Sequence, residues 1–308
     1  MRAAPRRLGW LAGLALVVLT ACDASAAAPA ATAPTAPSEA MTWPPATPTP
    51  AATAPVARRP VVVVDPGHAV DEVGAAAYGV VEKDSNLDFA VRVAALLRAR
   101  GVDALLTRTA DVRASLPGQE PARTTGWDGQ RLDLQARADI ANAARADAFV
   151  SIHSNGAPDP GIRGHEVYYN AARPFSPQNR RLATLLHDGV TAELTAAGLP
   201  AHPRGVIDDD CLKPFFGRCY PLFILGPSRT TDRAEIDARG GTPEGLGLAP
   251  DQPALVSRPS EVPGALVELL FVSSPDDAAL LRDEGARDAM ARGVARGILD
   301  FLGPQGGR

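Results

Sequence analysis

Four consecutive valines at residues 61–64, followed by Asp65, are the feature of the sequence that most limits its fold. A continuous β-branched run is typical of a strand that is buried on both faces. Further strand-like runs occur at Val102–Thr107, Asp147–His153 and Ala265–Leu270, and they alternate with segments of helical periodicity. This alternation predicts an α/β fold with a mostly parallel central sheet flanked by helices.

Five segments have the periodicity of helices. Asp84 or Ser85 would cap the first helix, and Gly101 would end it. The other predicted helices are Leu132–Ala146, Pro177–Ala197, Pro275–Arg282 and Gly285–Leu302. Gly164–Asn170 alternates in polarity, so it is predicted to be a strand with Val167 and Tyr169 on one face.

The first 21 residues are predicted to be a lipoprotein signal peptide. Three arginines precede the apolar run Leu8–Ala21, which is shorter than the roughly 18–20 residues that span a bilayer. The run ends in Leu-Thr-Ala-Cys at residues 19–22 and resembles the bacterial lipobox. This resemblance implies cleavage before Cys22 and a lipid on its thiol. A plain signal peptide with an incidental cysteine is the alternative.

Residues 22–59 are predicted to be a disordered tether. The segment is rich in Ala, Pro and Thr, and it holds eight of the 29 prolines of the chain. Such a composition cannot bury enough apolar surface to offset the entropy of ordering. A lipid on Cys22 would therefore hold the following domain in the cell envelope, outside the cytoplasm and anchored to a membrane.

Residues 60–303 are predicted to form a single catalytic domain. Two stretches, at about 113–130 and 208–259, interrupt its α/β pattern and are rich in Gly, Pro and charged residues. Loops of this length inside a compact domain are usually functional or disordered. The second stretch contains the apolar segment Tyr220–Leu225, a candidate strand. The rest of it is either a lid or inhibitory flap over the cleft or an inert loop.

Net charge and cysteine content exclude several classes. The formal net charge of −4 argues against a nucleic-acid partner, which needs a basic surface. Three cysteines are too few for a disulfide scaffold. If Cys22 carries lipid, Cys211 and Cys219 remain, and an oxidising envelope favours a disulfide between them. Two free thiols are the alternative.

Four residues that can carry chemistry lie at ends of predicted elements or within a strand. His68 follows the first strand, Glu82 precedes the first helix, His153 ends the third strand, and Glu268 lies in the last one. In α/β sheets, sites gather at the carboxyl ends of strands. Two imidazoles and a carboxylate suit catalytic zinc, and a further carboxylate suits a proton acceptor. Spacing alone leaves open that the two histidines are unrelated.

Five blocks in order make the chain similar to a known family. They are VVVVDPGH, EKDSNLDFAVRVAALLRARGVDALLTR, ARADIANAARADAFVSIHSN, GHEVYYN and VPGALVELLFVSSPDDAALL. Together they resemble the zinc-dependent N-acetylmuramoyl-L-alanine amidases of the amidase-3 class. The resemblance implies one Zn²⁺ ion and cleavage of peptidoglycan between N-acetylmuramate and L-alanine, in cell wall remodelling or cell separation. It matches His68, Glu82 and His153 to the metal ligands and Glu268 to the catalytic glutamate.

The chain departs from the family pattern near these residues. Ala69 and Val70 stand where glycines are usual, Leu270 replaces a glycine, and Ser274 replaces an asparagine. These changes leave the four key side chains in place. We expect them to alter the loop beside the metal and the shape of the substrate cleft.

Two further residues are candidate substrate contacts. Asn155 follows the strand that carries His153, and it binds substrate or caps a turn. His165 alternates with Glu166 in a predicted strand, so one of the two faces solvent or the cleft.

The remaining polar residues have structural interpretations. Asp65 would orient the His68 loop or hydrogen-bond a ligand histidine. Three arginines are expected to form salt bridges, with a stem-peptide carboxylate as an alternative partner for one of them; they are Arg108, Arg131 and Arg137. His187 and His202 are expected at the surface.

The sequence is also compatible with two other functions. One is a zinc amidase that acts on soluble muropeptides. The other is a non-catalytic wall-binding or regulatory module on the same fold, which the retained ligand set argues against. The sequence leaves open whether the enzyme is constitutively active or switched on by a protein activator.

Overall fold

The computed structural model describes residues 58–210, 213–215 and 218–303. The predicted signal peptide, the tether and Cys22 lie outside these residues. Cys211 and the side chain of Cys219 also lie outside them, so the disulfide remains a prediction.

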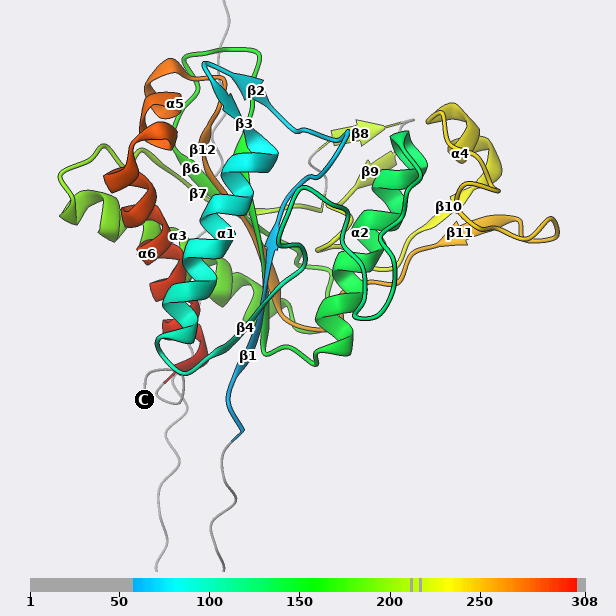
Figure 1. The fold of residues 1–308 in the computed structure, drawn as a ribbon, viewed down its shortest axis with the longest axis horizontal. Helices are drawn as coiled ribbons and strands as arrows, with labels where there is room; N and C mark the ends of the chain where they lie inside the picture. The colour runs from blue at the N-terminus through cyan, green and yellow to red at the C-terminus, as the bar shows by residue number, and fades with distance from the viewer. Residues whose placement is uncertain (1–57, 211–212, 216–217, 304–308) are drawn as a thin grey trace, which may run out of the picture. The chain divides into compact units, whose positions relative to one another are not determined.

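A six-stranded sheet forms the centre of the domain (Figure 1). Its strands, in spatial order, are β4 (Asp103–Leu106), β1 (Val61–Pro66), β5 (Ala148–Asn155), β12 (Gly264–Phe271), β6 (His165–Tyr169) and β7 (Pro203–Asp208). The pairs β4–β1, β1–β5, β5–β12 and β6–β7 are parallel, and only β12–β6 is antiparallel. The predicted mostly parallel sheet is therefore confirmed.

Helices cover both faces of the sheet. One face packs against α1 (Glu82–Arg98), α3 (Ser176–Ala196), α5 (Pro275–Arg282) and α6 (Glu284–Leu302). Helix α2 (Gly126–Ala143) covers the other face, on the opposite side of the sheet from α1 and α6 in Figure 1. Successive residues of β1 point to opposite faces of the sheet. Val62 and Val64 are buried under α1, α3 and α6, and Val63 is buried under α2.

Helix starts differ from the sequence prediction. Helix α1 begins at Glu82, ahead of the predicted caps Asp84 and Ser85, because the chain turns directly from the short hairpin β2 (Ala76–Ala77) and β3 (Val80–Val81) into the helix. Glu82 is thus part of the first helical turn. Helix α2 begins at Gly126, so part of the predicted irregular stretch 113–130 is helical.

The apolar segment Tyr220–Leu225 is not a strand, and this prediction was wrong. Strand β9 (Arg218–Tyr220) ends there and the chain turns. Ile224 and Leu225 are instead buried against Val63 and Phe149 in the core under α2. Burial of these side chains explains why the segment is apolar without being extended.

The second interrupting stretch is a structured insertion that packs on α2. It contains β8 (Lys213–Phe215), β9, β10 (Thr230–Asp232), α4 (Arg233–Ala238) and β11 (Ala254–Val256). The Asp128 carboxylate accepts a hydrogen bond of 3.0 Å from the Thr242 backbone N–H. The Arg131 guanidinium lies 5.0 Å from the centre of the Trp127 ring and 4.7 Å from that of Phe223.

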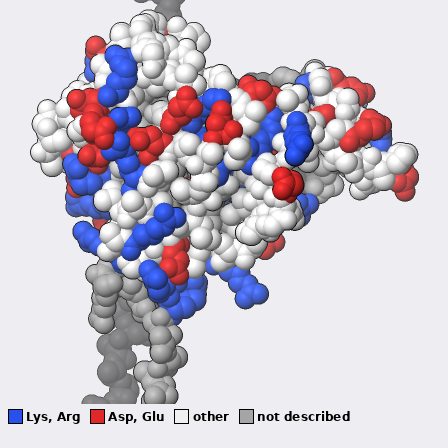
Figure 2. Space-filling view, in the orientation of Figure 1, with Lys and Arg blue, Asp and Glu red and all other residues white. Residues whose placement is uncertain are grey.

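Two surface properties bear on location and partners. On the face shown in Figure 2, the described acidic and basic side chains are intermixed, without a single basic field. No helix within residues 58–303, as far as they are described, is at once long and apolar enough to cross a bilayer.

Candidate active site

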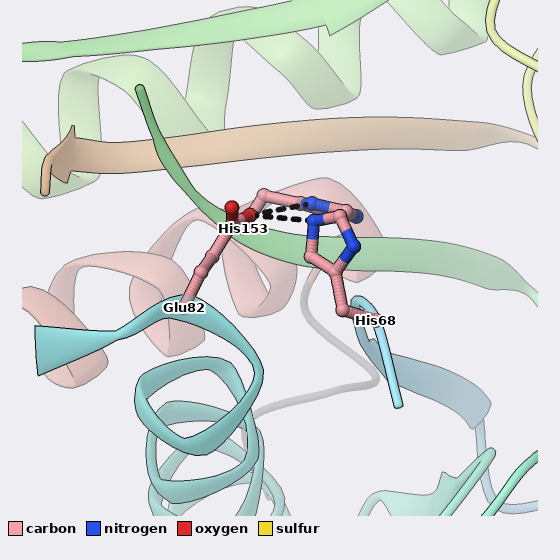
Figure 3. A group of neighbouring side chains, drawn as sticks. All are labelled: His68, Glu82 and His153. Carbon is pink, nitrogen blue, oxygen red and sulfur yellow. Dashed lines mark hydrogen bonds and ion pairs between the residues drawn. The ribbon is translucent and has the colours of Figure 1, made fainter. Parts of the chain in front are cut away.

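Three side chains from three separate elements meet at the sheet edge, with Glu82 Oε1 at their centre (Figure 3). His68 lies in the loop after β1, Glu82 opens α1, and His153 lies near the end of β5. His68 Nε2 is 2.8 Å from Glu82 Oε1, and His153 Nδ1 is 3.0 Å from the same oxygen. One donor atom from each residue lies within 4.8 Å of the other two, which is close enough for a shared metal ion. The predicted ligands are therefore brought together.

Two glycines create the space for these side chains. A Cβ atom on Gly67 would lie 2.3 Å from the Nε2 of His153, so this ring packs directly against the backbone. A Cβ atom on Gly74 would lie 2.3 Å from Glu82 Oε2 and 2.7 Å from His68 Cδ2. Gly74 also has φ +69°, a conformation that favours glycine.

The Glu82 carboxylate is held in its ionised form. Its Oε2 accepts a hydrogen bond of 2.7 Å from the Ala75 N–H, and it lies at the positive end of the α1 dipole. Burial alone would raise the pKa of Glu82, but hydrogen bonds from His153 and His68 hold it well below its usual range. An anionic oxygen between two imidazoles is a suitable donor set for Zn²⁺.

Glu72 is a site residue that the sequence reading missed. The Nδ1–H of His68 donates to Glu72 Oε2, which leaves Nε2 facing Glu82. Such a carboxylate fixes the tautomer and ring orientation of a metal ligand. Burial would lower the pKa of His68, but the hydrogen bonds to Glu72 and Glu82 raise it to about 10. For His153, burial is the largest effect and lowers the pKa.

A buried ion pair holds the loop that carries His68. Arg137 and Asp65 are both 1% exposed, and Nη1 of the arginine lies 2.6 Å from Asp65 Oδ1. The same guanidinium donates to the carbonyl oxygens of Pro66 and His68, the latter at 3.0 Å. Asp65 therefore orients the loop, as one of the two predicted interpretations had it. It does not hydrogen-bond a ligand histidine.

Glu268 lies next to the three-residue cluster. It pairs in register with His153 across the parallel strands β12 and β5. Alternation places both side chains on the α2 face, since their neighbours Val267 and Ile152 face the other core. Neighbouring strands lie about 4.8 Å apart, so a carboxylate and a candidate metal ligand stand side by side.

Residues 62–300 match the protein family described as N-acetylmuramoyl-L-alanine amidase. The chain belongs to this family. The endolysin of Bacillus phage SPP1 is 28% identical over 243 residues, which are 79% of this chain and 66% of the endolysin. The amidase AmiA of Salmonella typhimurium is 27% identical over 259 residues, which are 79% of this chain and 76% of AmiA.

A solved amidase has the same fold. The structure of the CwlD amidase from Clostridioides difficile in complex with the GerS lipoprotein aligns with a TM-score of 0.56 and 21% identity. The alignment covers 79% of this chain and 98% of CwlD. The predicted single-domain amidase fold is confirmed by this likeness.

Beyond Glu268, this amidase has a buried carboxylate that the sequence reading did not select. Glu166 on β6 pairs in register with Glu268 and is 4% exposed. It accepts hydrogen bonds from Asn155 (2.8 Å), the Tyr168 hydroxyl (2.6 Å) and the Nε–H of Arg204 (2.7 Å). Asn155, a candidate substrate contact, is thus a hydrogen-bond partner of Glu166.

His165 is not brought to the cluster. It is fully buried on the opposite face of the sheet, where Nδ1 donates to the Ala201 carbonyl (2.9 Å) and Nε2 lies 3.0 Å from the Thr191 hydroxyl. Burial lowers its pKa to about 4. The geometry gives no support to His165 as a substrate contact, since it lies on the face of the sheet opposite Glu166 and Glu268. His187, expected at the surface, is half-buried against the His165 ring, whereas His202 is exposed.

Two of the three predicted salt-bridge arginines have other roles. Arg137 pairs with Asp65, as described above. Arg108 instead donates to backbone carbonyls, including those of Pro66 (3.1 Å) and Gly67 (3.0 Å). Arg131 packs between the two aromatic rings named above, at the junction of α2 and the insertion.

The departures from the family pattern have local consequences. Val70 has φ +57° where a glycine is usual, which is a strained conformation for a β-branched residue. Ala69 exchanges two backbone hydrogen bonds of 3.1 Å with Glu72, so the loop stays closed. Leu270 is fully buried at a register shift between Glu268 and Phe271, and Ser274 precedes α5.

A cavity of about 170 Å³ adjoins the cluster. Its lining includes His68, His153, Arg137, Leu222 and Phe223. Small-molecule sites usually occupy about 300–1,000 Å³, so this cavity has room for a reacting group but not for a whole muropeptide. Leu222 and Phe223 belong to the insertion, which therefore forms one wall of the site.

Proposed function

We propose that this amidase hydrolyses the amide bond between N-acetylmuramate and the L-alanine of the stem peptide in peptidoglycan, with zinc as its cofactor. The observation that carries the proposal is the side-by-side placement of Glu268 and the His68–Glu82–His153 cluster at one sheet edge. It occurs in a chain whose residues 62–300 match the amidase family.

The residues present fit a zinc ion. His68, Glu82 and His153 offer two nitrogens and one carboxylate oxygen. Glu72 accepts a hydrogen bond from Nδ1 of His68 and so orients its ring. Three protein ligands of this kind leave one position for water or substrate in catalytic zinc sites. When bound, zinc supplies a Lewis acid that polarises the scissile carbonyl and lowers the pKa of a water molecule.

Glu268 would move the proton that hydrolysis requires. Its carboxylate accepts a proton from the attacking water as the oxygen bonds to the carbonyl carbon. It then delivers that proton to the alanine nitrogen as the carbon–nitrogen bond breaks. The products are the lactyl carboxylate of the sugar and a stem peptide with a free amine. No covalent enzyme intermediate is needed.

The proposed location is the cell envelope. A lipid on Cys22 and the tether of residues 22–59 would hold the catalytic domain at some distance from a membrane. A disulfide between Cys211 and Cys219 would be compatible with that oxidising compartment. Labelling of free thiols tests the disulfide, since two reactive thiols would contradict it. Mass spectrometry of the N-terminal peptide tests the lipid.

The function is tested with purified protein and isolated sacculi. We expect mass spectrometry to find intact stem peptides with a free N-terminal alanine among the released products. A chelator should stop the release, and added Zn²⁺ should restore it. Release of sugar fragments, or of peptides cut at an internal bond, would contradict the proposal. Cleavage of soluble muropeptides but not of sacculi would favour the soluble-substrate alternative.

A further inference from the structure

Arg204 occupies an irregular position in β7, the outermost strand of the sheet, close to the proposed catalytic glutamate Glu268. Its neighbour Pro203 pairs with His165, but Gly205 pairs with Glu166, so Arg204 is an extra residue in β7. Gly205 has φ +103°, which accommodates this bulge. Bulges occur beside active sites, where they re-aim a side chain. Here the bulge turns Arg204 toward the face that carries Glu166 and Glu268.

The guanidinium of Arg204 is held on two sides. Its Nε–H donates to Glu166 Oε2 at 2.7 Å, and its central carbon lies 5.1 Å from the centre of the Phe271 ring. Phe271 follows the register shift in β12 after Glu268, and Arg204 lies at the bulge in β7. These two strand irregularities bring Phe271 and Arg204 together. Buried Glu166 is itself fixed by Asn155 and Tyr168. The guanidinium is therefore oriented before any ligand arrives.

The outer edge of the same guanidinium is available. The Arg204 side chain is 39% exposed, while that of Glu166 is 6% exposed. Among the described residues, neither of its two terminal nitrogens has a hydrogen-bond partner. These two nitrogens form one free, planar edge of the guanidinium, which can bind a carboxylate through two parallel hydrogen bonds.

The position of Arg204 in the sheet places it beside the row of proposed catalytic residues. From β5 to β12 to β6, the register row is His153, Glu268 and Glu166, and Arg204 binds the last of these. Tyr168 and Arg204 both donate hydrogen bonds to Glu166, and burial together with the negative charges of Glu166 and Glu268 raises the pKa of Tyr168, which Arg204 opposes. Arg204 thus lies on the far side of Glu268 from the candidate metal ligands.

We propose that Arg204, held by Glu166 and Phe271, binds a carboxylate of the stem peptide and so positions the scissile amide between Glu268 and the His68–Glu82–His153 cluster. This inference rests on the proposed amidase function. A carboxylate is preferred over a sugar hydroxyl because the pre-oriented guanidinium presents charge and two donors in one plane. The peptide released by the reaction supplies such groups, whereas N-acetylmuramate offers hydroxyl and amide groups once its lactyl carboxyl is in the amide bond.

The test uses two pairs of synthetic N-acetylmuramoyl peptides. The members of the first pair differ only at the α-carboxyl of the second stem residue, which is a free acid or a carboxamide. The members of the second pair differ in the same way at the C-terminal carboxyl. For each pair, the acid-over-amide ratio of kcat/KM is measured for the wild type, Arg204→Gln and Arg204→Lys. Arg296→Gln, which changes an exposed arginine on α6, is the matched control.

We expect the wild type to prefer the acid in at least one pair by about tenfold or more, the size expected for a charge-assisted hydrogen bond. Arg204→Gln should lose this preference, Arg204→Lys should keep only part of it, and Arg296→Gln should retain all of it. Both peptides of a pair are assayed with the same enzyme preparation. A smaller fraction of folded enzyme therefore lowers both kcat/KM values equally and leaves their ratio unchanged. If Arg204→Gln does not fold, the reduced ratio of Arg204→Lys carries the test.

Two results would overturn the inference and are distinct from failure of the proposed function. A wild type that cleaves all four peptides without acid preference would exclude a carboxylate subsite. A preference that persists unchanged in Arg204→Gln and Arg204→Lys would assign it to another residue. If the wild type cleaved neither these peptides nor sacculi, the amidase function itself would be wrong and this inference would fall with it.

Discussion

Glu268 on β12 and His153 on β5 are register partners on adjacent parallel strands. Both side chains project from the face of the sheet that α2 covers. A candidate proton acceptor and a candidate metal ligand are therefore fixed by the sheet itself. Sites built on regular elements hold their geometry better than sites on loops alone. In this amidase, the loop-borne partner His68 is secured separately by Glu72 and by the Asp65–Arg137 pair.

Gly74→Ala should impair metal binding more than it impairs folding. The added Cβ would lie 2.3 Å from Glu82 Oε2, so the carboxylate must move. Gly79→Ala is the matched control, because Gly79 has φ +75° but open space around its Cβ position. Each variant should lose about 1–2 kcal/mol of unfolding free energy from the left-handed backbone. Only Gly74→Ala should lose zinc affinity, by about tenfold or more. Equal zinc affinity in a competition titration would contradict this account of Gly74.

Arg137→Met should destabilise the protein by about 3–5 kcal/mol, because it leaves Asp65 buried without its counter-charge. The variant also loses the bonds that Arg137 makes to the Pro66 and His68 carbonyls. Urea denaturation measures the change. The control is Arg292→Met, since Arg292 forms an exposed ion pair of 3.0 Å with Glu193. That pair should contribute about 0–1 kcal/mol. Similar losses of unfolding free energy in both variants would mean that the buried Arg137–Asp65 pair contributes no more to stability than an exposed ion pair.

His165 should make stability depend on pH in the acid range. Burial lowers its pKa to about 4, whereas an unfolded chain takes up the proton near pH 6.5. Between these values the unfolded state binds more protons, so stability is complete above pH 6.5 and falls as pH drops toward 4. Between pH 7 and 4.5, the wild type should lose about 2–3 kcal/mol more unfolding free energy than His165→Gln.

The same variant separates a structural role from a substrate contact. Because His165 lies on the face opposite Glu268, His165→Gln should change kcat/KM at pH 7 only slightly. Parallel pH profiles of stability in wild type and variant would refute the structural role. A large loss of activity in a fully folded variant would restore His165 as a substrate contact.

The sequence was sufficient to predict the cluster that a metal would need. His68, Glu82 and His153 each lie where a strand ends or a helix begins, and parallel topology brings such points to one edge. Glu72 could have been found, since it lies four residues after His68 in the same short loop. Its role depends on the left-handed conformations of His68 and Val70, which fold the loop back on itself.

Other parts of the site depend on three-dimensional register. Glu166 adjoins Glu268 only because β6 runs antiparallel to β12 with that alignment. Arg204 reaches Glu166 only through a bulge, and periodicity cannot reveal a single extra residue. The start of α2 was missed because its two glycines, Gly126 and Gly129, have low helix propensity. Packing against the insertion stabilises this turn through Trp127 and Asp128.

The most direct test compares metal content and cleavage of sacculi in the wild type, Glu268→Gln and His153→Ala. If Glu268 moves the proton and His153 holds the metal, Glu268→Gln should keep about one zinc per chain, as in typical catalytic sites. Its turnover should fall by about 10²–10⁴-fold, the usual contribution of a general base. His153→Ala should lose both zinc and turnover. Normal cleavage by Glu268→Gln, or full zinc content in His153→Ala, would contradict the division of roles between the two neighbouring residues.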